Sequence, residues 1–300
     1  MSDKKYKRRW GDRNDARRVK ETRGLQGLMP HLMPKRTDAE VFLSDKFDVT
    51  ELLQFVDRKN AENAANGLDY KITVFHCVVA AITKMIMERP VLNRFIQGRR
   101  LYERHEISMS FVAKRRFTDH AEEFLMVLVP GEEDTIDDVA HKIVGEVRET
   151  RKNEAANGID AILAKVTKLP MPILAFVFFI VRCLDFLGIN PKALTDGDTN
   201  YSTVLLSNLG SIKCPAVYHH LNNYGTNSIV ITIGTIHKEE LIMDDGTKQI
   251  RDVVDFGVTL DERIGDGFYF SRSLKVVKHI FAHPELLNQS LSSPTGFDYQ

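Results

Sequence analysis

The chain has 300 residues, and its 41 Lys and Arg residues balance 41 Asp and Glu residues. This length suits one large domain or two small ones, and a net charge of zero points to no class of partner. Three scattered cysteines, Cys77, Cys183 and Cys214, indicate a reducing compartment without a disulfide framework or zinc site. The N-terminus lacks the apolar core of a secretory signal, so we expect a cytoplasmic protein without a metal.

The first 38 residues form a basic N-terminal arm and connector. Lys and Arg crowd residues 1–24, with Trp10 among them, and a stretch broken by Gly and Pro follows. One interpretation is a solvated or partly helical arm, and the other is an electrostatic tether to an anionic membrane surface. Nucleic acid is not an expected partner, because a single aromatic residue makes no platform for base stacking.

The compact domain is expected to span residues 39–287. Periodicity and end signals predict a strand near 41–47, a helix from 49 to Asn66-Gly67, and an apolar helix at 73–89 that stops at Pro90. Further along they predict a hairpin turning at Gly98, strands at 107–113 and 125–129, and a helix from 139 to about 153. His76, in the first turn of the apolar helix, is expected to be a packed core histidine.

An apolar helical insertion is expected near residues 158–190. Its run L-P-M-P-I-L-A-F-V-F-F-I-V carries no charge until Arg182 and Asp185 interrupt it. Because a spanning helix needs about 20 apolar residues, this run predicts a buried or oligomer-packing helix. Attachment of residues 169–187 to a membrane surface, helped by the basic arm, is the alternative.

The last third of the chain is rich in predicted strands. The pattern predicts a turn at 196–200, strands at 201–206, 229–233 and 253–260, a hairpin turn at 244–246, and a closing helix at 271–283. The tail at 288–300 is polar and expected to be disordered. Since strands and helices mix without strict βαβ alternation, we expect an α/β fold with a mixed sheet and helices on one side.

Three short motifs resemble the chloramphenicol acetyltransferase-like superfamily, and within it the catalytic domains of dihydrolipoyl acyltransferases. They are the P-V-L-N turn at 90–93, the S-N-L-G run at 207–210 and the D-E-R-I-G-D-G run at 261–267. The resemblance covers roughly residues 40–287. It implies a two-layer α/β sandwich that forms trimers or multiples of trimers, with active sites at the subunit interfaces and coenzyme A or acyl-CoA as co-substrate.

The resemblance also implies roles for individual residues. Ser207 matches the serine that steadies the tetrahedral intermediate, and Asn208, Arg263 and Asp266 are expected to orient the reacting groups. The family keeps its catalytic histidine where this chain has Glu262. Burial raises the pKa of a carboxyl group and would let Glu262 act as the base. Alternatively, His219 or His220 supplies an imidazole from the neighbouring segment.

Two functions remain open at this point. The first is transfer of an acyl group from a thioester to an unidentified acceptor. The second is a catalytically inactive scaffold or binding protein, with membrane-surface attachment compatible with either. Relatives usually carry a lipoyl domain before the catalytic domain, and 38 residues cannot hold one, so we do not expect the chain to act on a lipoyl arm of its own. No phosphate loop, dinucleotide fingerprint or nucleophile elbow is found in the sequence.

Overall fold

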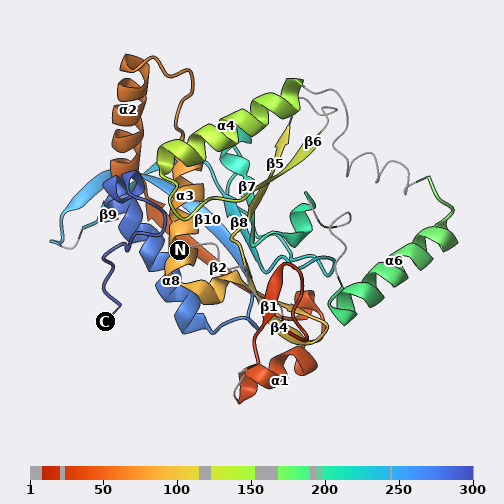
Figure 1. The fold of residues 1–300 in the computed structure, drawn as a ribbon. Helices are drawn as coiled ribbons and strands as arrows, with labels where there is room; N and C mark the ends of the chain where they lie inside the picture. The colour runs from red at the N-terminus through yellow and green to blue at the C-terminus, as the bar shows by residue number, and fades with distance from the viewer. Residues whose placement is uncertain are drawn as a thin grey trace.

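A seven-stranded mixed sheet forms the centre of the protein, and a three-stranded sheet lies beside it (Figure 1). The structure is a computed structural model, and it describes residues 9–20, 24–114, 123–152, 168–189, 195, 197–243 and 245–299. Along the large sheet the strand order is β2-β10-β8-β7-β5-β6, with β9 also paired to β10, and the small sheet has the order β1-β4-β3. β7 runs parallel to β5 and β8, and the other pairs are antiparallel.

The secondary structure follows the expected order. The strands are β1 (Ala16–Arg18), β2 (Glu40–Asp48), β3 (Arg94–Gln97), β4 (Arg100–Arg104), β5 (Met109–Lys114), β6 (Glu123–Leu128), β7 (Val204–Asn208), β8 (Ile229–Ile233), β9 (His237–Ile242) and β10 (Lys248–Asp261). The α-helices are α1 (Leu25–Leu32), α2 (Thr50–Ala65), α3 (Val74–Glu88), α4 (Ile136–Lys152), α6 (Met171–Leu187) and α8 (Gly267–Ala282). Short 3-10 helices are η1 (Arg36–Asp38), η2 (Pro90–Asn93), η3 (Thr199–Tyr201), η4 (Leu209–Ile212) and η5 (Pro284–Asn288).

Helices α2, α3, α4 and α8 cover one face of the large sheet, and the core lies between them and the strands (Figure 1). In β10, the alternating side chains of Val254, Phe256, Val258 and Leu260 enter this core. The predicted two-layer α/β arrangement with a mixed sheet is therefore confirmed. We call the opposite face of the large sheet its outer face.

The described part of the basic arm is built into the fold. β1 pairs with β4, and Arg13 is buried with its guanidinium 5.3 Å from the centre of the Phe95 ring. Asp15 accepts a 2.9 Å hydrogen bond from Nε of Arg13. The prediction of a solvated or partly helical arm is wrong here, because the arm's own carboxylate and an aromatic ring lodge the arginine. Residues 1–8 lie outside the described residues.

The C-terminal tail is ordered against α3 and α8. Leu291 is buried, and Glu88 accepts 2.7 Å hydrogen bonds from the hydroxyls of Thr295 and Tyr299. Phe297 packs against the core as well. The predicted disorder is wrong, because a few apolar and aromatic side chains anchor a segment that is otherwise polar.

Helix α6 stands away from the rest of the fold (Figure 1). Asp185 is the one residue of α6 that is buried, and its carboxylate accepts a 2.9 Å hydrogen bond from the Tyr201 hydroxyl. The helix is present where the sequence predicts it, but within this chain it is not a buried helix. Residues 158–167 and 190 of the predicted insertion, and Asp196 and Asp244 of the predicted turns, lie outside the described residues.

Two features are absent from the described residues. Among them, no helix is long and apolar enough to cross a membrane. In the same part of the chain, no group of three or more His, Cys, Asp or Glu side chains is arranged to hold a metal ion.

Candidate active site

Ser207 lies near the carboxyl end of β7 and faces the outer face of the sheet. Its neighbour Leu206 is in the core, so alternation along the strand turns Ser207 the other way. Its register partner on β8 is Thr232, whose hydroxyl is likewise on the outer face. The Ser207 side chain is half-buried. Its hydroxyl is thus held on a rigid strand and reachable from outside.

The turn after Ser207 depends on close backbone contact. A Cβ on Gly210 would lie 2.5 Å from the carbonyl oxygen of Gly234, so this position requires glycine. Asn208, which the sequence assigns an orienting role, is exposed, and its carbonyl accepts a hydrogen bond from Ser211. Close backbone packing therefore explains the glycine of the S-N-L-G motif, while Ser207 and Asn208 at its start are polar and accessible.

A cavity of about 430 Å³ opens beside Asn208. It lies between the ends of β7 and β8 and the start of α3, where Thr73 and Phe75 line it. His76 follows directly and caps the same helix, its Nδ1 accepting a hydrogen bond from the Thr73 amide. Burial lowers the pKa of His76 to about 4, so the ring is neutral. The prediction of a packed core histidine is confirmed.

The segment that carries the two candidate histidines crosses the outer face. Val217 donates its amide to the Thr232 hydroxyl at 3.2 Å, and that hydroxyl donates back to the Val217 carbonyl. Beneath the crossing lies Gly257 of β10, where a Cβ would approach the Val217 oxygen to 2.4 Å. A glycine in the central strand thus makes room for the crossing.

His219 and His220 are exposed and stacked on each other. Their ring centres are 4.7 Å apart, and Nδ1 of His219 donates to the His220 carbonyl at 2.8 Å. The segment is fixed just beyond them, where Glu40 of β2 accepts the Leu221 amide at 2.6 Å. Since Glu40 pairs with Asp261, the histidines lie towards the Glu262 end of the sheet.

A buried ion-pair cluster holds the turn that contains Glu262. Asp261 is fully buried and accepts hydrogen bonds from Nε and Nη2 of Arg263 at 2.7 and 2.6 Å. Nη1 of Arg263 donates to the carbonyl of Met33, and Nε of Arg36 lies 3.7 Å from Asp261. Arg263 therefore orients Asp261 and the connector. It does not pair with Glu262.

Arg36 connects this ion-pair cluster to other segments of the chain. Its buried guanidinium donates to the carbonyls of Ile96, Asn222 and Gly225. Burial lowers the pKa of Arg36 to about 10, and the charge of Asp261 acts against this shift. The connector, the small sheet and the histidine segment are all tied together through this one side chain.

Glu262 and Asp266 occupy the surface side of the same turn. Glu262 is half-buried, and its amide donates to the carbonyl of Ala39 at 2.9 Å. Asp266 caps α8 by accepting the Tyr269 amide at 2.7 Å. Asp266 therefore has a structural role in this chain, while the Glu262 carboxylate is available for chemistry.

Within one chain, Ser207 and Glu262 do not meet. Ser207 lies level with Thr232 and Gly257, and Glu262 follows Gly257 by five residues along the chain. At the usual spacings, that amounts to roughly 17 Å along the sheet and about 10 Å across two strands. A hydroxyl and a base that act on one carbonyl need to be within a few ångströms of it, so a single chain does not complete the predicted site.

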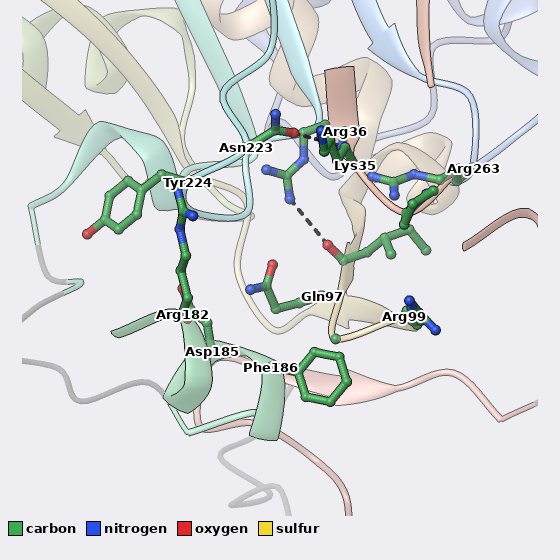
Figure 2. Close-up of a pocket in the computed structure, with 13 residues that line it drawn as sticks. Lys35, Arg36, Gln97, Arg99, Arg182, Asp185, Phe186, Asn223, Tyr224 and Arg263 are labelled. Carbon is green, nitrogen blue, oxygen red and sulfur yellow. Dashed lines mark hydrogen bonds between the residues drawn. The ribbon is translucent and has the colours of Figure 1, made fainter. Parts of the chain in front are cut away.

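A second cavity, of about 550 Å³, was not foreseen from the sequence (Figure 2). Among its lining residues are five cations: Lys35, Arg36, Arg99, Arg182 and Arg263. They come from the connector, the turn between β3 and β4, the end of α6 and the turn after β10. Lys35 and Arg36 are adjacent, but Arg99, Arg182 and Arg263 lie far from them and from one another in the sequence, so only the fold gathers the five cations.

Comparison with known proteins gives one family match. Residues 189–288 match the model of the 2-oxoacid dehydrogenases acyltransferase (catalytic domain). A curated relative, the lipoamide acyltransferase component of the branched-chain alpha-keto acid dehydrogenase complex of Bacillus subtilis, is 21% identical over 234 residues. That alignment covers 78% of this chain and 44% of the relative, so the chain spans less than half of the relative's length.

Solved structures share the fold. A probable dihydrolipoamide acetyltransferase from Listeria monocytogenes matches with a TM-score of 0.60 and 16% identity, covering 92% of this chain and 98% of the other. A chloramphenicol acetyltransferase matches with a TM-score of 0.52 and 13% identity, covering 89% and 99%. The resemblance that the sequence motifs predict is confirmed.

Proposed function

Because residues 189–288 match an acyltransferase catalytic domain, we propose that this chain transfers an acyl group between coenzyme A and an acceptor at a site shared by two copies. The observation that carries the proposal is the position of Ser207 and Glu262 at opposite ends of one sheet. A neighbouring copy, related by rotation, can bring its own Glu262 end to this Ser207 end. A homotrimer is the assembly we propose.

The outer face supports contact between copies. Phe42, Val217 and Tyr218 lie on it with their side chains 49%, 46% and 50% exposed, and the rings of Phe42 and Tyr218 are 5.4 Å apart. An exposed apolar patch beside candidate catalytic groups is typical of an interface. Burying it against a second copy would also remove water from the site.

The reaction follows from the roles of the groups. A base on one copy takes the proton from the acceptor, whose heteroatom attacks the thioester carbonyl carbon. The Ser207 hydroxyl of the other copy donates a hydrogen bond to the oxyanion that forms. Collapse of the intermediate breaks the carbon–sulfur bond, and the base returns its proton to the departing thiolate. The acyl group is then on the acceptor and the coenzyme A thiol is restored.

The base is Glu262 or one of the two histidines. Glu262 stands at the position where the family keeps its histidine, and it has a half-buried side chain. His219 and His220 are exposed in one copy and lie towards the same end of the sheet. All three candidates are therefore presented from the end opposite to Ser207.

Substitution of the motif histidine favours one competing function, a catalytically inactive scaffold or binding protein. Calorimetry with coenzyme A and acetyl-CoA separates the two. Binding at 100 times the dissociation constant should stabilise the protein by about 2.7 kcal/mol in a thermal-shift check. Absence of binding at millimolar ligand, in a folded trimer, would favour the scaffold.

Mixing two inactive variants tests the shared site. Ser207→Ala should abolish most turnover, as should the base variant among Glu262→Gln, His219→Gln and His220→Gln, whereas Ser271→Ala on the exposed side of α8 should not. If the two inactive variants are unfolded and refolded together, about one quarter of the sites in a cyclic trimer receive both intact groups. Activity near that level supports a shared site. A mixture as inactive as its parts would contradict it.

The predicted attachment to a membrane surface concerns residues 169–187 and the basic arm. It is compatible with either function, since these features lie apart from Ser207.

A further inference from the structure

Most apolar side chains of helix α6 are exposed, and only the stripe of Leu174, Val177, Val181, Leu184 and Asp185 is half-buried or buried. Phe178, Phe179 and Ile180 follow one another at about 100° steps, and all three are exposed. Phe176 and Phe179 are the most exposed of its aromatic side chains, at 62% and 61%. One such stripe suffices for packing against the rest of the chain, so the apolar side chains on the other sides of the helix are left exposed for another apolar surface.

Positive charge flanks the apolar run of this helix on both sides. Lys168 precedes the first turn and Arg182 lies within the helix, five residues before Leu187, and both are exposed. The run from Met171 to Val181 between them carries no charge and is about 16 Å long at 1.5 Å per residue. Since both cations favour the polar layer of a bilayer, the helix suits a position along the surface, with its apolar side chains in the acyl region.

The basic pocket lies at the base of α6. Arg182 and Phe186 of the helix line it together with Arg99 and Lys35 (Figure 2). The hairpin turn abuts the helix end, because a Cβ on Gly98 would lie 2.3 Å from the Phe186 carbonyl oxygen. Cationic pocket and apolar helix are therefore one continuous surface.

The cations of the pocket differ in whether they are already paired within the chain. Arg36 and Arg263 are buried and committed to Asp261 and backbone carbonyls. The single acid in the lining, Asp185, is bound to the Tyr201 hydroxyl and lies 3.9 Å from Arg13.

By contrast, Lys35, Arg99 and Arg182 are exposed, and the structure gives them no ion pair within the described residues. Three free cations above two buried ones leave the pocket with an excess of positive charge. An anion bound in the pocket would balance this positive charge.

We propose that α6 and the basic pocket together dock the protein on an anionic phospholipid bilayer, with lipid headgroup phosphates at Lys35, Arg99 and Arg182. The apolar helix matches the acyl chains of a phospholipid, and the cations beside it match the anionic headgroup. The inference does not rest on acyl transfer.

Vesicle flotation tests the proposal with the full chain. Vesicles of phosphatidylcholine alone are compared with vesicles that contain about 30% phosphatidylglycerol, an anionic lipid that gives the vesicle a negative surface. The wild type should float with the anionic vesicles, and high salt should weaken this binding. Failure to bind anionic vesicles at low salt overturns the proposal.

Matched variants locate the surface. The double variant Phe176→Asp/Phe179→Asp should reduce binding at least about tenfold, because it puts charge where acyl chains would lie. Arg99→Gln/Arg182→Gln should reduce binding to anionic vesicles by about fivefold for each charge removed. The control Ile242→Asp/Ile250→Asp changes two equally exposed apolar residues on the hairpin of β9 and β10 and should bind as the wild type does.

Two further results would overturn the proposal in favour of another occupant. If Phe176→Asp/Phe179→Asp lowers the mass of the oligomer in lipid-free solution, a second copy covers α6. If Arg99→Gln/Arg182→Gln weakens coenzyme A binding and leaves vesicle binding unchanged, the pocket holds the phosphates of coenzyme A. Circular dichroism and thermal melts confirm that each variant is folded.

Discussion

Replacing Asp261 should destabilise the protein far more than replacing another acid on the same strand. Its carboxylate is fully buried, accepts two hydrogen bonds from Arg263 and faces Arg36 at 3.7 Å. In Asp261→Ala, the buried guanidinium groups of Arg36 and Arg263 lose the carboxylate that they face. Breaking a buried pair in this way costs about 3–5 kcal/mol, which is a large part of a typical folding stability of about 5–15 kcal/mol.

Asp252 of β10 is the matched control. It pairs with Lys238, whose side chain is 70% exposed, so Asp252→Ala should cost at most about 1 kcal/mol. Asp261→Asn keeps the volume of the side chain and isolates the effect of charge. Urea unfolding at one fixed protein concentration measures all three. Equal free energies of unfolding for Asp261→Ala and Asp252→Ala would refute the idea that this cluster holds the Glu262 turn.

Three other predictions concern burial and close packing. Because burial lowers the pKa of His76 to about 4, from an ordinary value near 6.5, the folded state binds fewer protons than the unfolded state, and melting temperatures should be level above about pH 6.5 and fall towards pH 4. His76→Gln should flatten that fall. Gly257→Ala, whose Cβ would lie 2.4 Å from the Val217 carbonyl oxygen, should cost about 1–3 kcal/mol in urea unfolding. Gly145→Ala in α4, where no atom lies near the added Cβ, should stabilise the protein by up to about 1 kcal/mol. If Gly145→Ala destabilised the protein more than Gly257→Ala, the close crossing of Val217 over Gly257 would be contradicted. Finally, burial raises the pKa of the Cys77 thiol to about 12, so a thiol reagent should label Cys183 and Cys214 in the folded protein and Cys77 only after unfolding.

The strands and helices of the core were predictable from local pattern. β10 alternates apolar residues at Val254, Phe256, Val258 and Leu260, and this period of two fixes both the strand and its buried face. Pro90 marks the end of α3 for an equally local reason, since its ring ends a helix. Such signals need no knowledge of distant residues.

The surroundings of the candidate site were not predictable in the same way. Arg36 sits in a connector and meets Asp261 only because η1 packs at the end of β10. The motif assigned an orienting role to Arg263, and the structure gives it one, but towards Asp261 and not towards Glu262. Arg36 and Asp261 are more than 200 residues apart, so local periodicity gives no sign that they meet.

Polar composition also misled the prediction for the tail. Residues 288–299 hold several Ser, Asn and Gln residues, yet Leu291, Phe297 and Tyr299 suffice to order them. Arg89 adds to this, since its guanidinium lies 5.0 Å from the centre of the Tyr299 ring. A few well-placed contacts outweigh an average over composition.

One segment, 213–225, joins the two regions to which we assign function. It leaves the turn after Ser207, crosses the outer face at Gly257 and carries His219 and His220 to the end of the sheet where Glu262 lies. There its Asn222 and Gly225 carbonyls accept hydrogen bonds from Arg36 in the wall of the basic pocket.

The same segment then reaches α6. The Tyr224 ring lies 6.1 Å from the ring of Phe178 and 5.7 Å from that of Tyr201, whose hydroxyl holds Asp185 at the base of the helix. Burial raises the pKa of Tyr224 to about 12, so its hydroxyl stays protonated and can keep donating. Tyr224 therefore links α6 to the segment that carries both histidines. The proposed acyl-transfer site and the proposed lipid-docking surface thus share one segment of the chain, 213–225.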